Sequence, residues 1–150
     1  MKLTNMVIPT GVISYGSPVA EAFSECLSCN VQGIPFVDRE GRITGQFSVR
    51  ETIKHYCISH TMIKDADFLG DDLGPLTLKS TDAAEMLSQP ADHFILPEVV
   101  TIHSDAPCIK AMALMEKHNT TFLFVVDSDT YKGIINVQAI ARWFMKTAGL

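Results

Sequence analysis

Two stretches of the chain share one order of apolar and polar positions. Residues 34–56 contain an apolar run ending in Val-Asp, a short polar turn with a Gly, a second apolar run and a segment with helical spacing. Residues 122–144 repeat this order. Short apolar runs between turn residues predict β-strands, and apolar residues spaced three and four apart predict a helix. Each stretch therefore predicts strand, turn, strand and helix.

The similarity extends upstream of both stretches. Ile13 corresponds to Ile102 at an offset of 89 residues; one residue is lost in the turn, so Gly45 corresponds to Gly133 at an offset of 88. Further pairs at offset 89 are Pro18 and Pro107, Ala22 and Ala111, Asn30 and Asn119, Val37 and Val126, and Asp38 and Asp127. Agreement over some 50 residues with one gap indicates an internal repeat.

Each copy also predicts a short strand and a helix before its hairpin. In the first copy, Ser17 can cap the helix, with Pro18 at its first position. The apolar stripes of the two helices are Val19, Ala22, Phe23, Cys26 and Leu27, and Cys108, Ala111, Met112 and Met115. The expected strands are 12–13, 34–37 and 43–47, then 100–102, 122–126 and 133–135, and the closing helices are 50–59 and 137–147.

One such unit is marginal alone, but two copies packed sheet to sheet bury both inner faces. We therefore expect an α+β protein with a first motif over 1–60, a connecting segment over 61–90 and a second motif over 91–150. In the connecting segment, Thr81-Asp82 predicts the cap of a short helix at 83–87.

This layout resembles the CBS-domain pair, also called a Bateman module. The resemblance is carried by PFVDREGRITGQFSVRETI and FVVDSDTYKGIINVQAI, and by the VAEAF and IKAMALM helices before them. It implies two βαββα repeats packed sheet to sheet with pseudo-two-fold symmetry, in a stand-alone module. The family's members commonly form flat homodimers through their closing helices.

The resemblance also implies a ligand site. In the family, a Gly-x-x-Ser/Thr-x-x-Asp motif holds the ribose hydroxyls of an adenosine-type ligand. The first copy reads Gly45, Ser48 and Glu51 at these positions, which keeps a hydroxyl and a longer carboxylate. The second copy reads Gly133, Asn136 and Ala139 and has lost both groups.

By this pattern the ligand lies between the copies, with the ribose against Ser48 and Glu51. The resemblance places the base against Ile95, Val100, Thr120 and Thr121. The family's phosphate-binding positions are here the uncharged Gln32 and Gly33, for which Arg50 or Lys54 could substitute. The implied ligand is AMP, ADP, ATP or S-adenosylmethionine, and no further cofactor is required.

Two readings of the function follow. In the first, the chain is a regulatory sensor that binds an adenosyl ligand and signals to an unknown client protein. In the second, it is a ligand-free scaffold, because Ser48 and Glu51 also match a capping box and Asn136 also suits an N-cap. In both readings we expect a homodimer through the closing helices, with Ile53, Tyr56, Ile140, Trp143 and Phe144 at the contact.

The composition limits the classes of partner that we expect for this chain. The net charge is −5, and no basic run is present, so we expect neither nucleic-acid nor membrane binding. No stretch approaches the ~18 apolar residues of a membrane span. The N-terminus faintly resembles a signal peptide, but Asn5 and Pro9 interrupt its apolar core, so we expect no cleavage. The hydrophobic content of 47% suits burial against a partner subunit.

The sequence offers no clear catalytic constellation. Cys26 and Cys29 form a CxxC at the end of a predicted helix, where free thiols in a reducing cytoplasm are the better interpretation. The acidic run 65–71 lacks the oxygen ligand at position 5 and the Glu at position 12 of an EF-hand. The five His show no metal-binding spacing, and no nucleophile or phosphate-loop motif is present. We expect a protein that is not an enzyme and holds no metal.

Overall fold

The computed structural model describes residues 2–72 and 78–150, and the strands of these residues form two three-stranded mixed sheets. In each sheet the first strand pairs in parallel with the second, and the second and third form an antiparallel hairpin. The first sheet contains β1 (Ile13–Ser14), β2 (Gly33–Val37) and β3 (Ile43–Ser48). The second contains β4 (Thr101–Ile102), β5 (Phe122–Asp127) and β6 (Thr130–Asn136). The predicted duplication is thus confirmed.

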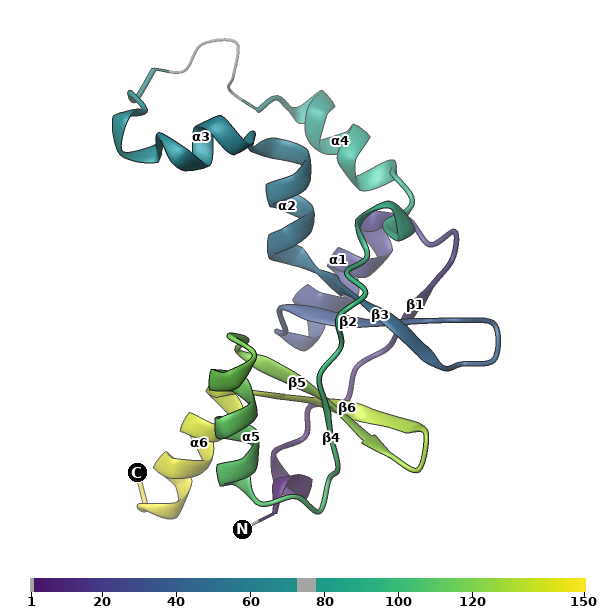
Figure 1. Cartoon of the computed structure of the whole chain (residues 1–150), viewed down its shortest axis with the longest axis vertical. Coiled ribbons are helices and arrows are strands. Elements are labelled where there is room, and N and C mark those ends of the chain that lie inside the picture. Colours follow the sequence, from purple (N-terminus) through teal and green to yellow (C-terminus); the bar gives the residue numbers. More distant parts are fainter. Residues whose placement is uncertain (1, 73–77) are drawn as a thin grey trace.

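Two helices accompany each sheet and lie on its outer side (Figure 1). They are α1 (Val19–Cys29) and α2 (Val49–Cys57) in the first repeat, and α5 (Cys108–Lys117) and α6 (Val137–Thr147) in the second. Between the repeats run α3 (His60–Lys64), the 3₁₀ turn η2 (Ala66–Phe68) and α4 (Ser80–Ser88). Further 3₁₀ turns are η1 (Leu3–Met6) and η4 (Ala91–Phe94). Figure 1 shows α3 and α4 at the end of the molecule away from α5 and α6.

The two sheets share a core. Ile34 and Phe47 of the first sheet pack in one buried cluster with Phe124 and Ile134 of the second. The cluster joins buried residues of both repeats, so burial of these side chains from water stabilises the association of the repeats. The expected α+β fold with sheet-to-sheet packing is therefore confirmed.

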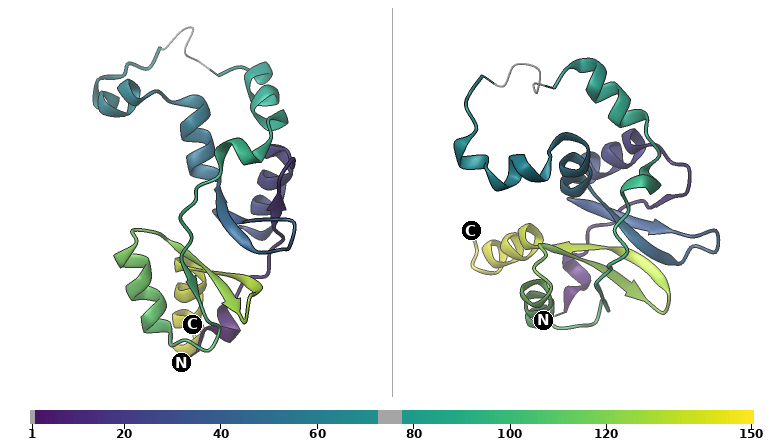
Figure 2. Two further views of the ribbon diagram at one scale, coloured as in Figure 1. Left: turned by 45° about the vertical axis from the view of Figure 1, so that its right-hand side comes forward. Right: turned by 45° about the horizontal axis from the view of Figure 1, so that its top comes forward.

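Each repeat also pairs with the segment that leads into the other. Ile8 pairs with Ile134 through two backbone hydrogen bonds of 2.8 Å, and Leu96 pairs with Gln46 through bonds of 2.9 and 3.0 Å. Both pairings are related by the offset of 88 residues. Figure 2 shows the N-terminal segment lying beside the second repeat, near the C-terminus. Leu3 and Met6 accordingly belong to the core of the second repeat.

Some local predictions differ from the structure. Helix α1 begins at Val19 with an extended Pro18 as N-cap, so Ser17 does not cap it. The cause is tertiary: the Ser17 carbonyl accepts from the amide of Ala91, and the Val19 amide donates to the carbonyl of Gln89. The predicted apolar stripe of α1 is wrong at Leu27, which is 75% exposed and not part of the buried face.

The short connecting helix starts earlier than predicted. Helix α4 begins at Ser80, and the carboxylate of Asp82 accepts from the backbone amide of Lys79, the N-cap residue. Among the described helices, none combines the length and the apolar character that crossing a bilayer requires.

Candidate ligand pocket

A pocket of about 410 Å³ lies between the two repeats. One wall comes from Gln46 of β3, whose side-chain amide donates to the carbonyl of Glu98 at 2.5 Å. The remaining wall belongs to the second repeat. The lining residues are Gln46, Glu98, Val99, Val100, His118, Thr120, Phe122 and Phe124. Its volume and its mixture of aromatic and polar groups are typical of small-molecule sites.

The structure brings only some of the predicted base-pocket residues to this place. Val100 and Thr120 line the pocket. Ile95 instead packs in the shared core, and its Cγ2 atom stands 2.5 Å from where a Cβ on Gly45 would lie. Thr121 is exposed, and its carbonyl accepts from the amide of Val137 at 3.2 Å.

Ser48 and Glu51 lie at the start of α2, outside the pocket lining. The Ser48 hydroxyl accepts from the backbone amide of Glu51 at 3.2 Å and so caps α2. The Glu51 carboxylate lies 3.7 Å from the ammonium of Lys54. A capping box consists of two reciprocal hydrogen bonds. The one from the Glu51 amide to the Ser48 hydroxyl is present, so this part of the prediction is confirmed.

Phe122 adjoins the pair formed by Gly33 and Ser48 on neighbouring strands. A Cβ on Gly33 would stand 3.0 Å from Cζ of Phe122. Gly33 pairs with Ser48 across the hairpin, and directly paired residues project to the same face of a sheet. The Phe122 ring therefore lies over the face that carries the Ser48 hydroxyl and forms the boundary of the pocket on that side.

The predicted phosphate positions carry no charge toward the pocket. The Gln32 side-chain oxygen is buried and has no hydrogen-bond partner among the described residues, while its backbone carbonyl accepts from the Val49 amide. Arg50 is exposed and lines a separate apolar hollow on α2 and α3. The other residues of that hollow are Ile53, Lys54, Ile58 and Ile63.

The second repeat uses its motif positions for structure. The side-chain oxygen of Asn136 accepts from the amide of Ala139 at 2.9 Å and caps α6. Asn136 is only 1% exposed, and Ala139 is buried. This confirms the interpretation of Asn136 as a cap.

Sequence reasoning missed several pocket residues. Gln46 lies two positions before Ser48, so strand alternation places both on one face of β3. The same alternation relates Phe122 and Phe124 on β5. Glu98, Val99 and His118 come from loops, and only the packing of the repeats brings them to the pocket. No periodic signal in the sequence identifies these three.

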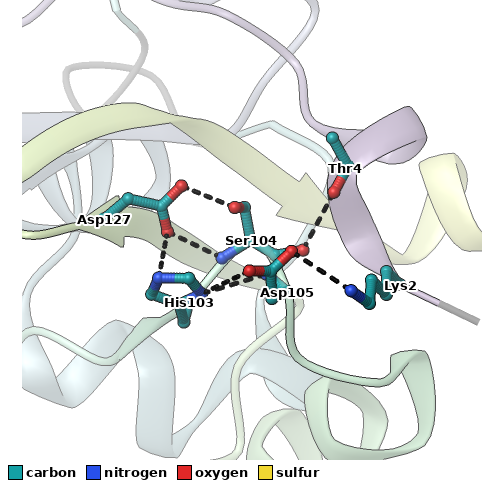
Figure 3. Close-up of polar contacts among 6 residues, drawn as sticks. All are labelled: Lys2, Thr4, His103, Ser104, Asp105 and Asp127. Carbon is teal, nitrogen blue, oxygen red and sulfur yellow. Dashed lines mark hydrogen bonds and ion pairs between the residues drawn. The ribbon is translucent and has the colours of Figure 1, made fainter.

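A separate polar cluster fixes the loop after β4 (Figure 3). The Ser104 hydroxyl and amide donate to the two oxygens of Asp127 at 2.5 and 2.9 Å, and Nε2 of His103 lies 3.2 Å from the same carboxylate. These hydrogen bonds from Ser104 lower the pKa of Asp127. The Ser104 hydroxyl donates to a carboxylate and not to the imidazole, so the arrangement lacks the base that activates a serine nucleophile.

The four cysteines are unpaired, and Cys26 and Cys108 are buried. Burial raises the pKa of the Cys26 thiol to about 12, which keeps it protonated and unreactive at neutral pH. Within residues 2–72 and 78–150, no three His, Cys, Asp or Glu side chains gather as metal ligands.

Comparison with known proteins agrees with this architecture. Residues 91–146 match the CBS domain family. No curated protein matches the chain significantly. The CBS domain pair of protein MJ0100, solved in complex with 5′-methylthioadenosine and S-adenosyl-L-methionine, superimposes with a TM-score of 0.66 at 17% identity, covering 98% of both chains.

Two further solved structures show the same fold. A putative acetoin utilization protein, AcuB, from Vibrio cholerae aligns with a TM-score of 0.66 at 15% identity, over 100% of this chain and 94% of its own. A CBS domain-containing protein of unknown function from Bacillus anthracis aligns with a TM-score of 0.66 at 14% identity, over 97% and 94%. Residues 91–146 thus match the CBS domain family, and the chain has the fold of a CBS domain pair over nearly its whole length.

Proposed function

We propose that this chain is a non-catalytic regulatory module that binds an adenosine-containing ligand between its repeats and signals to a client protein. The observation that carries the proposal is the pocket of about 410 Å³ whose walls come from both repeats. The complex of the MJ0100 domain pair with two adenosyl compounds supports the ligand class. The unpaired cysteines suit a cytoplasmic setting.

The pocket chemistry favours an adenosyl ligand of low negative charge. The half-buried Phe122 offers aromatic surface to a purine ring, and Thr120 and Gln46 offer polar groups to its edge. Glu98 is the acidic residue in the lining; its carboxylate suits ribose hydroxyls or a sulfonium cation. We therefore expect S-adenosylmethionine or methylthioadenosine to bind more tightly than ATP, whose triphosphate would be repelled.

Binding would act by population shift. A ligand that contacts Gln46 on the first repeat and Thr120 on the second binds best at one relative orientation of the two sheets. It therefore favours that orientation over others, by as much as its affinity differs between them. Helix α3, which follows α2 closely in the chain, is placed to carry such a change outward.

A ligand-free scaffold is the second candidate, and one observation favours it. The Ser48 hydroxyl is already engaged as a cap, and the Glu51 carboxylate is next to Lys54. In this reading the motif residues serve the helix alone, and the pocket stays filled with water.

Thermal unfolding with each adenosyl compound separates the two candidates. A ligand at 100 times its dissociation constant adds about 2.7 kcal/mol to the free energy of unfolding, which raises the midpoint visibly. We expect this rise with S-adenosylmethionine, and a loss of about tenfold in affinity in Glu98→Gln. Glu116→Gln, an exposed acid outside the pocket, is the matched control. No rise with any adenosyl compound would favour the scaffold.

The proposal includes a homodimer. Phe144 on α6 and Ile53 on α2 are exposed apolar residues, and Val137 and Met145 extend the apolar surface of α6. Ile140 lies in the core of its own repeat, and Trp143 is half-buried against that core, so both offer little area to a partner. Tyr56 is also half-buried. The contact would therefore centre on Phe144 and Ile53.

A further inference from the structure

A second hollow, of about 610 Å³, lies between η1 and α6 and shares no residue with the pocket between the repeats. One side of it comes from η1 and the residues that follow, and the other from one face of α6. The lining residues are Asn5, Met6, Val7, Ile8, Ala139, Arg142, Trp143, Lys146 and Thr147. We call it the η1–α6 hollow.

The hollow is positively charged within an acidic protein. Arg142 and Lys146 are one helical turn apart and therefore project to the same side of α6. Neither forms an ion pair with a described residue. The segments 2–20 and 130–150, which supply both walls, contain none of the chain's 17 Asp and Glu residues. An anion in the hollow would thus meet two cations without a competing Asp or Glu side chain from these segments.

Comparison of the repeats explains why Arg142 has no acidic partner on its own helix. At the offset of 88 residues, Arg142 corresponds to Lys54, and Ala139 corresponds to Glu51. In the first repeat Lys54 is paired with Glu51 at 3.7 Å. In the second repeat the carboxylate is replaced by a methyl group, so the cation at the equivalent position loses its partner.

The same comparison explains why the hollow is open. Trp143 corresponds to His55, and Met6 corresponds to Phe94. In the first repeat the rings of His55 and Phe94 pack edge to face, with centroids 5.5 Å apart, across the equivalent space. In the second repeat Met6 is buried in the core, and Trp143 stands as a half-buried wall. In the first repeat, the His55–Phe94 ring pair and the Glu51–Lys54 ion pair thus occupy the equivalent positions.

The opposite side of α6 carries different chemistry. Val137 and Phe144 are exposed on that side, seven residues apart, and form the surface assigned above to the dimer contact. The hollow and the dimer contact are thus on separate faces of one helix. The two surfaces adjoin where the rings of Trp143 and Phe144 pack edge to face, with centroids 5.3 Å apart.

We propose that the η1–α6 hollow binds a small organic anion: a molecule with a flat apolar group and a phosphate, sulfonate or carboxylate. The flat group packs against the Trp143 indole, and the anion is held by the guanidinium of Arg142 and the ammonium of Lys146. Charge-assisted hydrogen bonds to these two groups supply the specificity for an anion.

Trp143 is the only tryptophan in the chain, so its fluorescence reports on this hollow directly. The probe is phenyl phosphate, titrated at low ionic strength, with benzyl alcohol as the neutral analogue and inorganic phosphate as the anion without a ring. We expect a saturable change with phenyl phosphate, and an affinity that falls as salt screens the charges. Arg142→Ala and Lys146→Ala should each weaken binding at least about tenfold.

The controls separate this site from the proposed adenosyl pocket. Lys117→Ala removes an exposed cation of α5 and should bind phenyl phosphate as the wild type does. Glu98→Gln should also leave phenyl phosphate binding intact. Arg142 and Lys146 are exposed, so their removal leaves the core unchanged. Equal affinity in both alanine variants, equal binding of benzyl alcohol, or no saturable change up to about 10 mM would each overturn the proposal.

Discussion

The carbonyl oxygen of Ile8 lies so close to Gly133 that a Cβ on Gly133 would stand 2.3 Å from it. The equivalent contact in the first repeat is between Gly45 and the carbonyl of Leu96, at 2.8 Å. In both repeats, therefore, the first glycine of the Gly-x-x-Ser/Asn motif leaves room for a segment of the other repeat. That segment, which precedes β1 or β4, passes close to the last strand of the sheet, β6 or β3. This role is structural and independent of any ligand.

Gly133→Ala should destabilise the protein by about 2–4 kcal/mol, because the new methyl group meets backbone and the φ of +147° at this position strains any other residue. Urea unfolding followed by circular dichroism measures the change. Gly70→Ala is the control, since nothing lies within 4 Å of a Cβ there. A loss in Gly133→Ala no greater than in Gly70→Ala would contradict the close approach.

Removal of the cap of α6 should lower stability more than removal of the cap of α2. Asn136→Ala leaves the Ala139 amide without its acceptor in a buried place, and we expect a loss of about 2 kcal/mol. Ser48→Ala should lose about 1 kcal/mol, because its bond of 3.2 Å is longer and only partly buried. Asn136→Ser, which keeps an acceptor, should recover part of the loss. Chemical denaturation of the three variants tests this order.

The Asp127 carboxylate should contribute stability that depends on pH. Its pKa is lowered in the folded protein by the hydrogen bonds from Ser104, so the contribution is complete above the unfolded pKa of about 3.9 and disappears as the pH falls through the folded pKa. Asp127→Asn should therefore be less stable than the wild type at pH 7, and the difference should shrink on acidification.

Asp129→Asn is the matched control for this experiment. Asp129 is exposed in the turn of the same hairpin, and Asn also tolerates its left-handed conformation, with φ of 67°. Unfolding midpoints measured between pH 3 and 7 should separate the two variants. A constant difference between Asp127→Asn and the wild type over this range would refute the electrostatic explanation.

Phe144→Ser should convert the proposed homodimer to a monomer. The ring is 53% exposed on α6, and its removal leaves a polar group at the centre of the expected contact. Ile109→Ser, at a residue 71% exposed on α5, should remain dimeric. Size-exclusion chromatography with light scattering at micromolar concentration gives the mass of each. A monomeric wild type would remove the basis of the dimer.

The repeat architecture could be predicted because each element carries its own periodic signal. The strands β2 and β5 begin and end within one residue of the expected limits, since apolar runs between turn residues define them locally. The start of α1 could not be predicted, because Pro18 pairs with Pro90, which is remote in the sequence. Such a pairing outweighs the local preference of Ser17 for a cap.

The candidate pocket could be predicted only in part, for a similar reason. Val100 and Thr120 followed from the resemblance to the CBS-domain pair, and both line the pocket. Glu98 and His118 reach it through the packing of the repeats, which no local pattern encodes. The side of α6 proposed for the dimer contact was also ambiguous, because Ile140 and Phe144 belong to one apolar stripe and only the fold buries the first.

Through the pairing of Ile8 with Ile134 and of Leu96 with Gln46, each half hydrogen-bonds to the sheet of the other. A protease nick within residues 61–90 would sever the covalent link without parting the fragments, since each completes the edge of the other. We therefore expect neither half to fold as an autonomous unit.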